Sequence, residues 1–130
     1  MPKTPVPPPA DSFLPLKPIE FLILMTVATG ERHGYGIMLD IAERTGGSVR
    51  LEAGGLYRNI RRLLADKLLT ESARRPAADL DDERRRYYRL TDFGRRVAGA
   101  EVERLAALVS VAREKRLPSR RGPGPLPEGA

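Results

Sequence analysis

The chain has 130 residues, a formal net charge of +6 and no cysteine. This length allows one domain with a modest core. Without cysteine there is no disulfide and no thiolate site, and one histidine cannot build a zinc cluster, so we expect no metal or other cofactor. The positive charge suits a polyanionic partner such as nucleic acid.

The composition divides the chain into four parts. Residues 1–12 hold five prolines and residues 117–130 mix proline, glycine and arginine, so both ends are predicted to be disordered tails. Between them we expect a domain at residues 13–91 and a helix at residues 92–116. No apolar run reaches the roughly 18 residues of a membrane span, and no signal-peptide core is visible, so a cytoplasmic protein without membrane contact is expected.

Residues 16–29 predict a first helix that is apolar on nearly every side. Pro18 is tolerated in its first turn, and Gly30 follows its end. Such a helix must be buried on all sides, and a small domain has few elements to cover it. We therefore expect a second chain to cover part of it, the alternative being a central helix in a monomer. Its candidate dimerisation residues are Phe21, Leu22 and Met25.

A second helix is predicted at residues 35–44, after a turn at residues 31–36 and before a pair of glycines that end it. His33 in the turn lacks a partner histidine, cysteine or carboxylate pair, so a packing or hydrogen-bonding role is favoured over catalysis. Tyr35 stands at the amino end of the helix, where a hydroxyl and free backbone amides can hold a phosphate.

Residues 54–67 are the stretch that points most directly to function. Apolar residues recur there at the spacing of one helical face, and the remaining positions are mostly arginine. Such a helix suits a nucleic-acid groove, where side chains bind phosphates or read base edges. Taken alone, the stretch also fits an ordinary surface helix. The candidate DNA contacts in it are Gly55, Tyr57, Arg58, Asn59, Arg61 and Arg62.

After this helix the periodicity changes to that of strands. Residues 68–74 and 84–90 predict a hairpin, with the polar segment 75–83 as its tip. A helix-turn-helix followed by a two-stranded hairpin is a winged helix, so the predicted fold is mostly α with a small β-hairpin. Candidate contacts to the DNA backbone just after the tip are Arg84, Arg85 and Arg86.

Thr91 is predicted to cap the last helix, with Asp92 in its first turn. Apolar residues then step by four and three, as in the seam of a coiled coil. We expect this seam to pair with its own copy or with the first helix of a partner chain; packing back onto its own domain is the alternative. The candidate dimerisation residues are Val102, Leu105, Leu108, Val109 and Ala112.

Three motifs resemble those of the PadR-like transcriptional regulators, of the short type with one carboxyl-terminal helix. They are His33-Gly34-Tyr35-Gly36, Gly54-Gly55-Leu56-Tyr57, and Arg86-Tyr87-Tyr88-Arg89-Leu90-Thr91 followed by Gly94. The resemblance covers about residues 16–112. It implies a dimeric winged-helix repressor that binds an inverted repeat, with the first and last helices forming the dimer. It also implies that Tyr57 and its neighbours contact the operator, that the basic end of the hairpin reaches the flanking backbone or minor groove, and that small molecules can weaken DNA binding.

Three positions depart from the family's pattern. Arg58 stands where proline is frequent, which adds a candidate phosphate or base contact but leaves the start of the helix less fixed. Residues 79–83 make the hairpin tip acidic, and acids repel phosphate, so we do not expect the tip to enter a groove. Lys67 occupies a helix-ending place where glycine is easier, at a modest strain cost.

The sequence thus predicts a dimeric, sequence-specific DNA-binding regulator. Arg58, Asn59 and Arg62 are expected to read base edges or nearby phosphates, and Tyr35 and Tyr57 to anchor the backbone. The alternative is a winged-helix interaction or scaffold module whose arginine face meets an acidic protein. An enzyme is not expected, because no paired carboxylates, no nucleophile with a base and no phosphate-cradling loop are visible.

A small-molecule effector, where one exists, is expected at the dimer interface. The chain has no tryptophan and only 5% aromatic residues. A cavity there would be lined mainly by Phe21, Met25, Leu105 and Val109. We therefore expect no phenolic or planar ligand to bind tightly.

Overall fold

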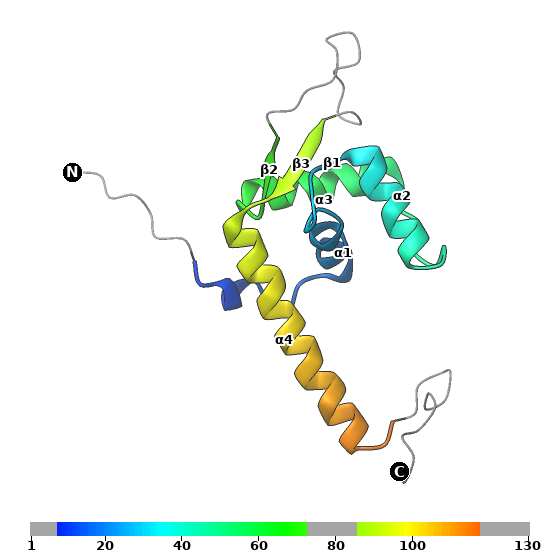
Figure 1. Ribbon diagram of the computed structural model, residues 1–130, viewed down its shortest axis with the longest axis vertical. Coiled ribbons are helices and arrows are strands. Elements are labelled where there is room, and N and C mark those ends of the chain that lie inside the picture. Colours follow the sequence, from blue (N-terminus) through cyan, green and yellow to red (C-terminus); the bar gives the residue numbers. More distant parts are fainter. Residues whose placement is uncertain (1–7, 73–85, 118–130) are drawn as a thin grey trace, which may run out of the picture.

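The computed structural model describes residues 8–72 and 86–117, which form a mostly helical domain with one long projecting helix (Figure 1). Within that part the elements are η1 (Ala10–Phe13), α1 (Pro18–Thr26), β1 (Arg32–His33), α2 (Gly34–Arg44), α3 (Ala53–Ala65), β2 (Leu69–Glu71), β3 (Tyr87–Leu90) and α4 (Asp92–Glu114). The predicted fold class, mostly α with a small β-hairpin after a helix-turn-helix, is confirmed.

Two helices begin with side-chain caps, at His33, which was predicted to fix the turn by packing or hydrogen bonding, and at Thr91, which was predicted to be a cap. The Nδ1 atom of His33 accepts the backbone N–H of Gly36 at 2.8 Å, and its ring packs edge-on against Tyr87. The hydroxyl of Thr91 accepts the backbone N–H of Gly94, also at 2.8 Å. Each cap satisfies a backbone donor that the first turn of a helix leaves without a partner. The structural role predicted for His33 is therefore confirmed.

Left-handed backbone follows three of the helices, at Gly46 and Gly47 after α2, at Lys67 after α3 and at Arg116 after α4. Gly46 and Gly47 have φ angles of +61° and +83° directly after α2, which is the conformation that glycine adopts most easily. Lys67 has a φ angle of +65° after α3, as expected from its position. These residues turn the chain sharply, so that α2 leads towards α3 and α3 leads into the sheet.

The antiparallel sheet has the order β1-β3-β2, with β3 in the middle. Leu69 pairs with Leu90 across the predicted hairpin, and Arg32 pairs with Tyr88 on the other side of β3. The strand β1 was expected to be part of a turn, because two residues are too few to show a strand periodicity. Residues 73–85, which include the predicted hairpin tip, Arg84 and Arg85, lie outside the described part of the chain.

One hydrophobic core joins α1, α2, α3, the sheet and the first turns of α4. The wholly buried side chains at its centre are Ile23, Leu24, Ile37, Ile41, Leu56, Ile60, Leu63, Leu68, Leu69 and Val97. On α1 the side chains of Phe21 and Leu22 are only half-buried, and Met25 is exposed. The chain's own domain therefore covers most of α1. Only one side of that helix remains for the second chain that the sequence predicted to cover it.

The amino-terminal boundary lies earlier than predicted. Instead of ending a disordered tail, Ala10–Phe13 form η1, which lies against α4. The ring of Phe13 packs edge-on against Phe93, with 5.6 Å between the ring centroids. The contact of this half-buried phenyl ring with Phe93 holds the segment against α4. Residues 1–7 and 118–130, which hold most of the two predicted tails, are outside the described residues.

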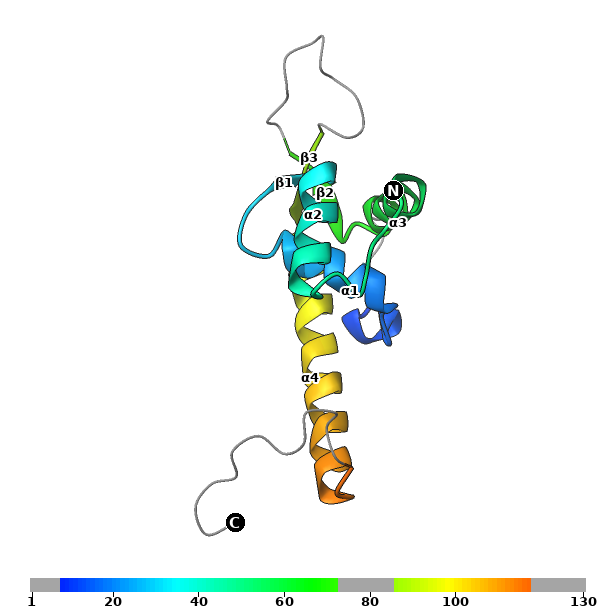
Figure 2. The same ribbon diagram turned by 90° about the vertical axis from the view of Figure 1, so that its right-hand side faces the viewer.

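The long helix α4 has two parts in different surroundings. Its first part packs against the domain, where Gly94, Val97 and Glu101 are buried. Beyond Glu101 the helix extends away from the domain, and no side chain as far as Glu114 is buried (Figures 1 and 2). Glu101 therefore marks the point at which α4 leaves the domain.

The carboxylate of Glu101 is 2% exposed and is held by several donors. Its Oε2 atom accepts the backbone N–H of Leu16 at 3.2 Å, and Arg104 donates to both carboxylate oxygens, at 2.5 and 2.9 Å. The hydrogen bond from Arg104 and its charge hold the pKa of the Glu101 carboxyl below its ordinary value of about 4.5, although burial opposes this shift. This carboxylate connects α4 to the segment before α1, a contact that the sequence did not predict.

Candidate nucleic-acid interface

Helix α3 separates its apolar and basic residues onto different sides. Leu56, Ile60 and Leu63 are fully buried, whereas Arg58 and Arg62, one turn apart, are exposed. No acidic side chain occurs between Ala53 and Ala65. The exposed side of α3 therefore presents arginines without a counter-charge on the same helix, which is the arrangement expected of a helix that binds an anionic surface.

Tyr57 does not lie on that exposed side. Its side chain is 5% exposed and lies over Gly34, where an added Cβ would come within 2.5 Å of the ring. The tyrosine thus fixes the start of α2 against α3. Because the ring is part of the core, Tyr57 offers little surface to an operator in this arrangement, and its contact with DNA stays a prediction.

Tyr35 follows Gly34 in the first turn of α2 and is 48% exposed, so its side chain lies on the surface. Arg61, one turn after Tyr57 on α3, is also exposed. Both predicted contacts are thus on the surface of the domain. Their binding to DNA remains a prediction.

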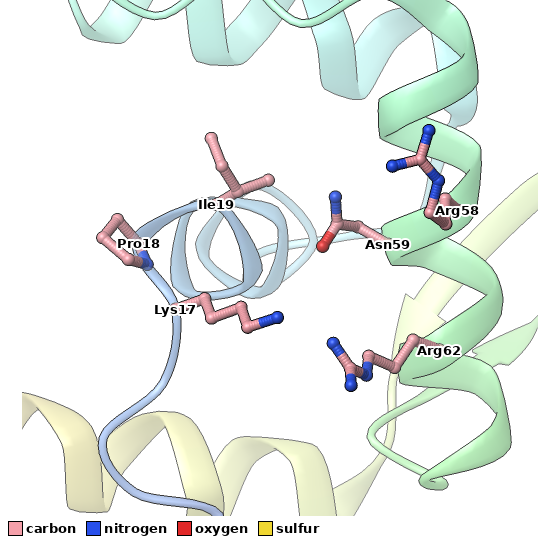
Figure 3. A pocket seen from close by; sticks show the side chains of 6 residues that line it. All are labelled: Lys17, Pro18, Ile19, Arg58, Asn59 and Arg62. Atoms are coloured by element: carbon pink, nitrogen blue, oxygen red, sulfur yellow. The ribbon is translucent and has the colours of Figure 1, made fainter.

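The side chain of Asn59 is turned towards its own helix and α1. Its Nδ2 atom donates to the backbone oxygen of Gly55 at 2.8 Å, and the residue is half-buried. Figure 3 shows the amide beside Lys17 and Ile19, in a cleft between the two helices. Asn59 is therefore less available for reading bases than the sequence suggested, because one of its amide donors is already used.

The paired glycines at the start of α3 expose backbone. Neither Gly54 nor Gly55 has a left-handed φ angle, and an added Cβ would meet no atom within 4 Å at either position. The fold itself thus gives no reason for glycine here. A bare helix start is where a bulky partner can approach the backbone closely, and glycine permits that approach.

A cleft of about 580 Å³ lies between the start of α1 and α3. Its lining residues are Lys17, Pro18, Ile19, Arg58, Asn59 and Arg62 (Figure 3). Lys17 immediately precedes α1, and its backbone N–H donates to Glu20 at 3.0 Å, which fixes the helix start. Lys17 is not among the contacts predicted from the sequence, where its only signal is a basic residue directly before the Pro18 that opens a helix.

At the hairpin, Arg86 is exposed and its Nε atom lies 3.8 Å from Oε1 of Glu71. This acid partly neutralises the arginine, since the two charges are separated by less than the ion-pair limit of about 4 Å. Arg86 is thus a weaker candidate for a backbone contact than Arg58 or Arg62 of α3.

The candidate dimerisation residues form a strip on the projecting part of α4. Val102 and Leu108 are each 53% exposed and Val109 is 48% exposed, while Leu105 and Ala112 are half-buried. Large apolar side chains that are uncovered on one helix mark a surface for another protein chain. The strip is consistent with the predicted seam, but the structure contains one chain and the pairing remains a prediction.

Residues 23–100, more than half of the chain, match the model of the family described as "Transcriptional regulator PadR-like family". The chain belongs to this family. The resemblance inferred from the three motifs is thereby confirmed, and the protein is a DNA-binding transcriptional regulator rather than an enzyme. A comparison with curated proteins finds no match.

Solved structures of PadR-family regulators share the fold. A transcriptional regulator from Clostridium thermocellum aligns with a TM-score of 0.63 at 22% identity, covering 74% of this chain and 87% of the other. A PadR family regulator from Clostridium difficile aligns with a TM-score of 0.63 at 22% identity, covering 76% and 98%. Bacillus subtilis PadR, solved with operator DNA, aligns with a TM-score of 0.56 at 21% identity, covering 78% and 64%.

Residues 8–72 and 86–117 contain no group of three or more histidine, cysteine, aspartate or glutamate side chains placed to hold a metal ion. Within the same residues no helix has the length and apolar character needed to cross a membrane.

Proposed function

We propose that this PadR-family regulator is a homodimer that represses transcription by binding an inverted-repeat operator. The observation that carries the proposal is the acid-free arginine side of α3, which is exposed while the opposite side is buried in the core. Such a helix can enter a major groove with its buried side still held by its own domain. Because the partner is then chromosomal DNA, we place the protein in the cytoplasm.

The dimer is inferred from the apolar strip on α4. Val102, Leu105 and Val109 follow the four-and-three spacing of a coiled coil, and two of them are about half exposed in a single chain. Pairing two copies through this strip would cover these side chains. A two-fold dimer places two copies of α3 in symmetric positions, and an operator that two such helices read has the same symmetry.

The arginines of α3 would have different tasks. Arg58 lies at the centre of the exposed side, suited to bases, while Arg61, one turn after the Tyr57 that packs over Gly34, and the exposed Tyr35 of α2 are suited to backbone phosphates. An effector at the interface between α1 and α4 would meet mainly aliphatic side chains, so phenolic and planar compounds should bind weakly. A thermal-shift screen in which such compounds strongly stabilise the protein would contradict that part of the proposal.

The test is a mobility-shift titration with operator DNA at several salt concentrations. For Arg62→Ala we expect about a 10-fold to 100-fold loss of affinity, and for the wild-type chain a steep fall of affinity with salt. Arg113→Ala, which changes an exposed arginine in the last turn of α4, is the matched control and should bind as the wild type does. An unchanged affinity in Arg62→Ala with a flat salt response would reject DNA binding through α3 and favour an acidic protein partner.

A further inference from the structure

The cleft between α1 and α3 brings three cations together. Lys17 from the start of α1 and Arg62 from α3 point into it from opposite sides, and Arg58 lines it one turn before Arg62 (Figure 3). None of the six lining residues is acidic. Within residues 8–72 and 86–117, none of these three side chains forms an ion pair.

No acidic side chain in the lining of the cleft balances these cations. Like charges that approach one another across a cleft repel, and the repulsion is only partly screened by water and salt. Lysine and arginine side chains are long enough to turn away from one another, yet Lys17 and Arg62 both point into the cleft. An anion between them would convert the repulsion into two attractions, and a guanidinium is well shaped to hold a phosphate through two N–H groups.

The position of the cleft identifies the source of the phosphate. Arg58 and Arg62 belong both to the cleft and to the exposed side of α3, so the cleft is continuous with the surface that faces DNA in the proposed function. Pro18 and Ile19 form an apolar wall beside the cations, which suits the sugar next to a phosphate better than a fully hydrated free ion. A duplex lying along α3 would therefore place backbone over this cleft.

We propose that the cleft binds one phosphate of the operator backbone, held between Lys17 and Arg62. The inference rests on the proposed function and deepens it in two ways. It adds the start of α1 to the DNA interface, and it assigns Arg62 to phosphate, leaving Arg58 as the arginine of α3 that contributes most to sequence preference.

The two kinds of contact differ in a measurable way. Loss of a phosphate contact weakens binding to every sequence by a similar factor and lowers the salt slope by about one per contact, hence by about two for a dimer in which both chains carry the substitution, whereas loss of a base contact relaxes sequence preference at one position in each half-site. For Lys17→Gln we expect a several-fold lower affinity for operator and scrambled duplexes alike. For Arg58→Ala we expect the ratio between operator and scrambled duplex to fall.

The experiment measures the salt dependence of DNA binding by fluorescence anisotropy with the full chain. Lys17→Gln is compared with Lys17→Arg, which keeps the charge and should keep the wild-type slope. Lys115→Gln, at the end of α4 and away from the cleft, is the matched control and should also keep it. Because the Lys17 backbone rather than its side chain fixes the start of α1, circular dichroism should show the same fold in all variants.

The outcomes separate this inference from the proposed function. A slope for Lys17→Gln equal to that of the wild type would overturn the phosphate site while leaving α3 as the DNA-binding helix. A wild-type chain that binds neither operator nor scrambled duplex would reject the proposed function itself. Calorimetry with inorganic phosphate distinguishes the remaining case: Lys17-dependent binding of phosphate together with an unchanged DNA slope would assign the cleft to a free anion and overturn the DNA assignment.

Discussion

Helix α3 and the projecting part of α4 are both amphipathic, yet they leave opposite sides uncovered. In α3 the apolar side is buried and arginines face outwards. In α4 beyond Glu101 the uncovered side includes Val102, Leu108 and Val109. Helix α3 has buried its apolar residues in the core, so it offers charged side chains to a partner. The projecting part of α4 has apolar residues that remain uncovered, so it offers an apolar seam. The two surfaces thus suit chemically different partners: DNA for the arginine side of α3 and a protein chain for the apolar seam of α4.

The largest effect is expected from breaking the α4 surface. Val109→Asp places a charge in the seam, which should convert the dimer to a monomer and lower operator affinity about 100-fold or more, because two linked half-sites gain that much from acting together. Ala107→Asp places the same charge on the opposite side of the helix and is the control. Sedimentation and anisotropy measure the two effects. A monomeric wild-type chain, or a Val109→Asp dimer with full affinity, would contradict the assignment.

The next largest effect is expected from a substitution that tests whether the first part of α4 is packed against the domain while the projecting part is not. An added Cβ at Gly94 would lie 2.1 Å from the backbone oxygen of Leu68, whereas one at Gly99 would meet no atom within 4 Å. We expect Gly94→Ala to lower the free energy of unfolding by about 3 kcal/mol through overpacking. Gly99→Ala should raise it by up to about 1 kcal/mol through helix propensity. Urea denaturation measures both changes, and equal effects of the two substitutions would show that the first part of α4 is not packed as described.

The smallest effect concerns the junction at Glu101. Because the folded-state pKa of this carboxyl lies below its ordinary value, its contribution to stability is present above about pH 4.5 and is lost as the pH falls through the lower folded-state pKa. Glu101→Gln should therefore reduce stability at pH 7 and weaken its dependence on pH in the acid range. Thermal denaturation from pH 3 to pH 7 measures this. A variant with the wild-type pH profile would show that the carboxylate does not hold α4 to the segment before α1.

Much of the fold follows from periodicity in the sequence. Long apolar repeats predicted all four α-helices, and the change to alternation predicted the hairpin, because burying one side of an element requires a regular spacing of apolar residues. The two short elements were not predicted, because β1 has two residues and η1 has four, which are too few to show a pattern. They are held by contacts with residues far away in the chain, such as Phe13 with Phe93, which spacing cannot reveal.

The candidate interface was predicted less completely than the fold. Arginine on one side of a helix was visible in the sequence, but the direction of individual side chains was not. Tyr57 looked polar enough for the surface and is buried, because it fills the space above Gly34. Lys17 and Glu101 were overlooked, since each acquires its role from a partner on another element. The role of a side chain that depends on tertiary contacts can be recognised only in the structure.

Selection of bound sequences from a random pool of DNA tests the central claim most directly, because it reports on α3 and α4 at once. Two paired chains with α3 in successive major grooves should recover an inverted repeat whose half-sites are centred about 10 base pairs apart, bound by two chains per duplex. Recovery of sequences with no shared motif, or of a single half-site bound by one chain, would contradict the account.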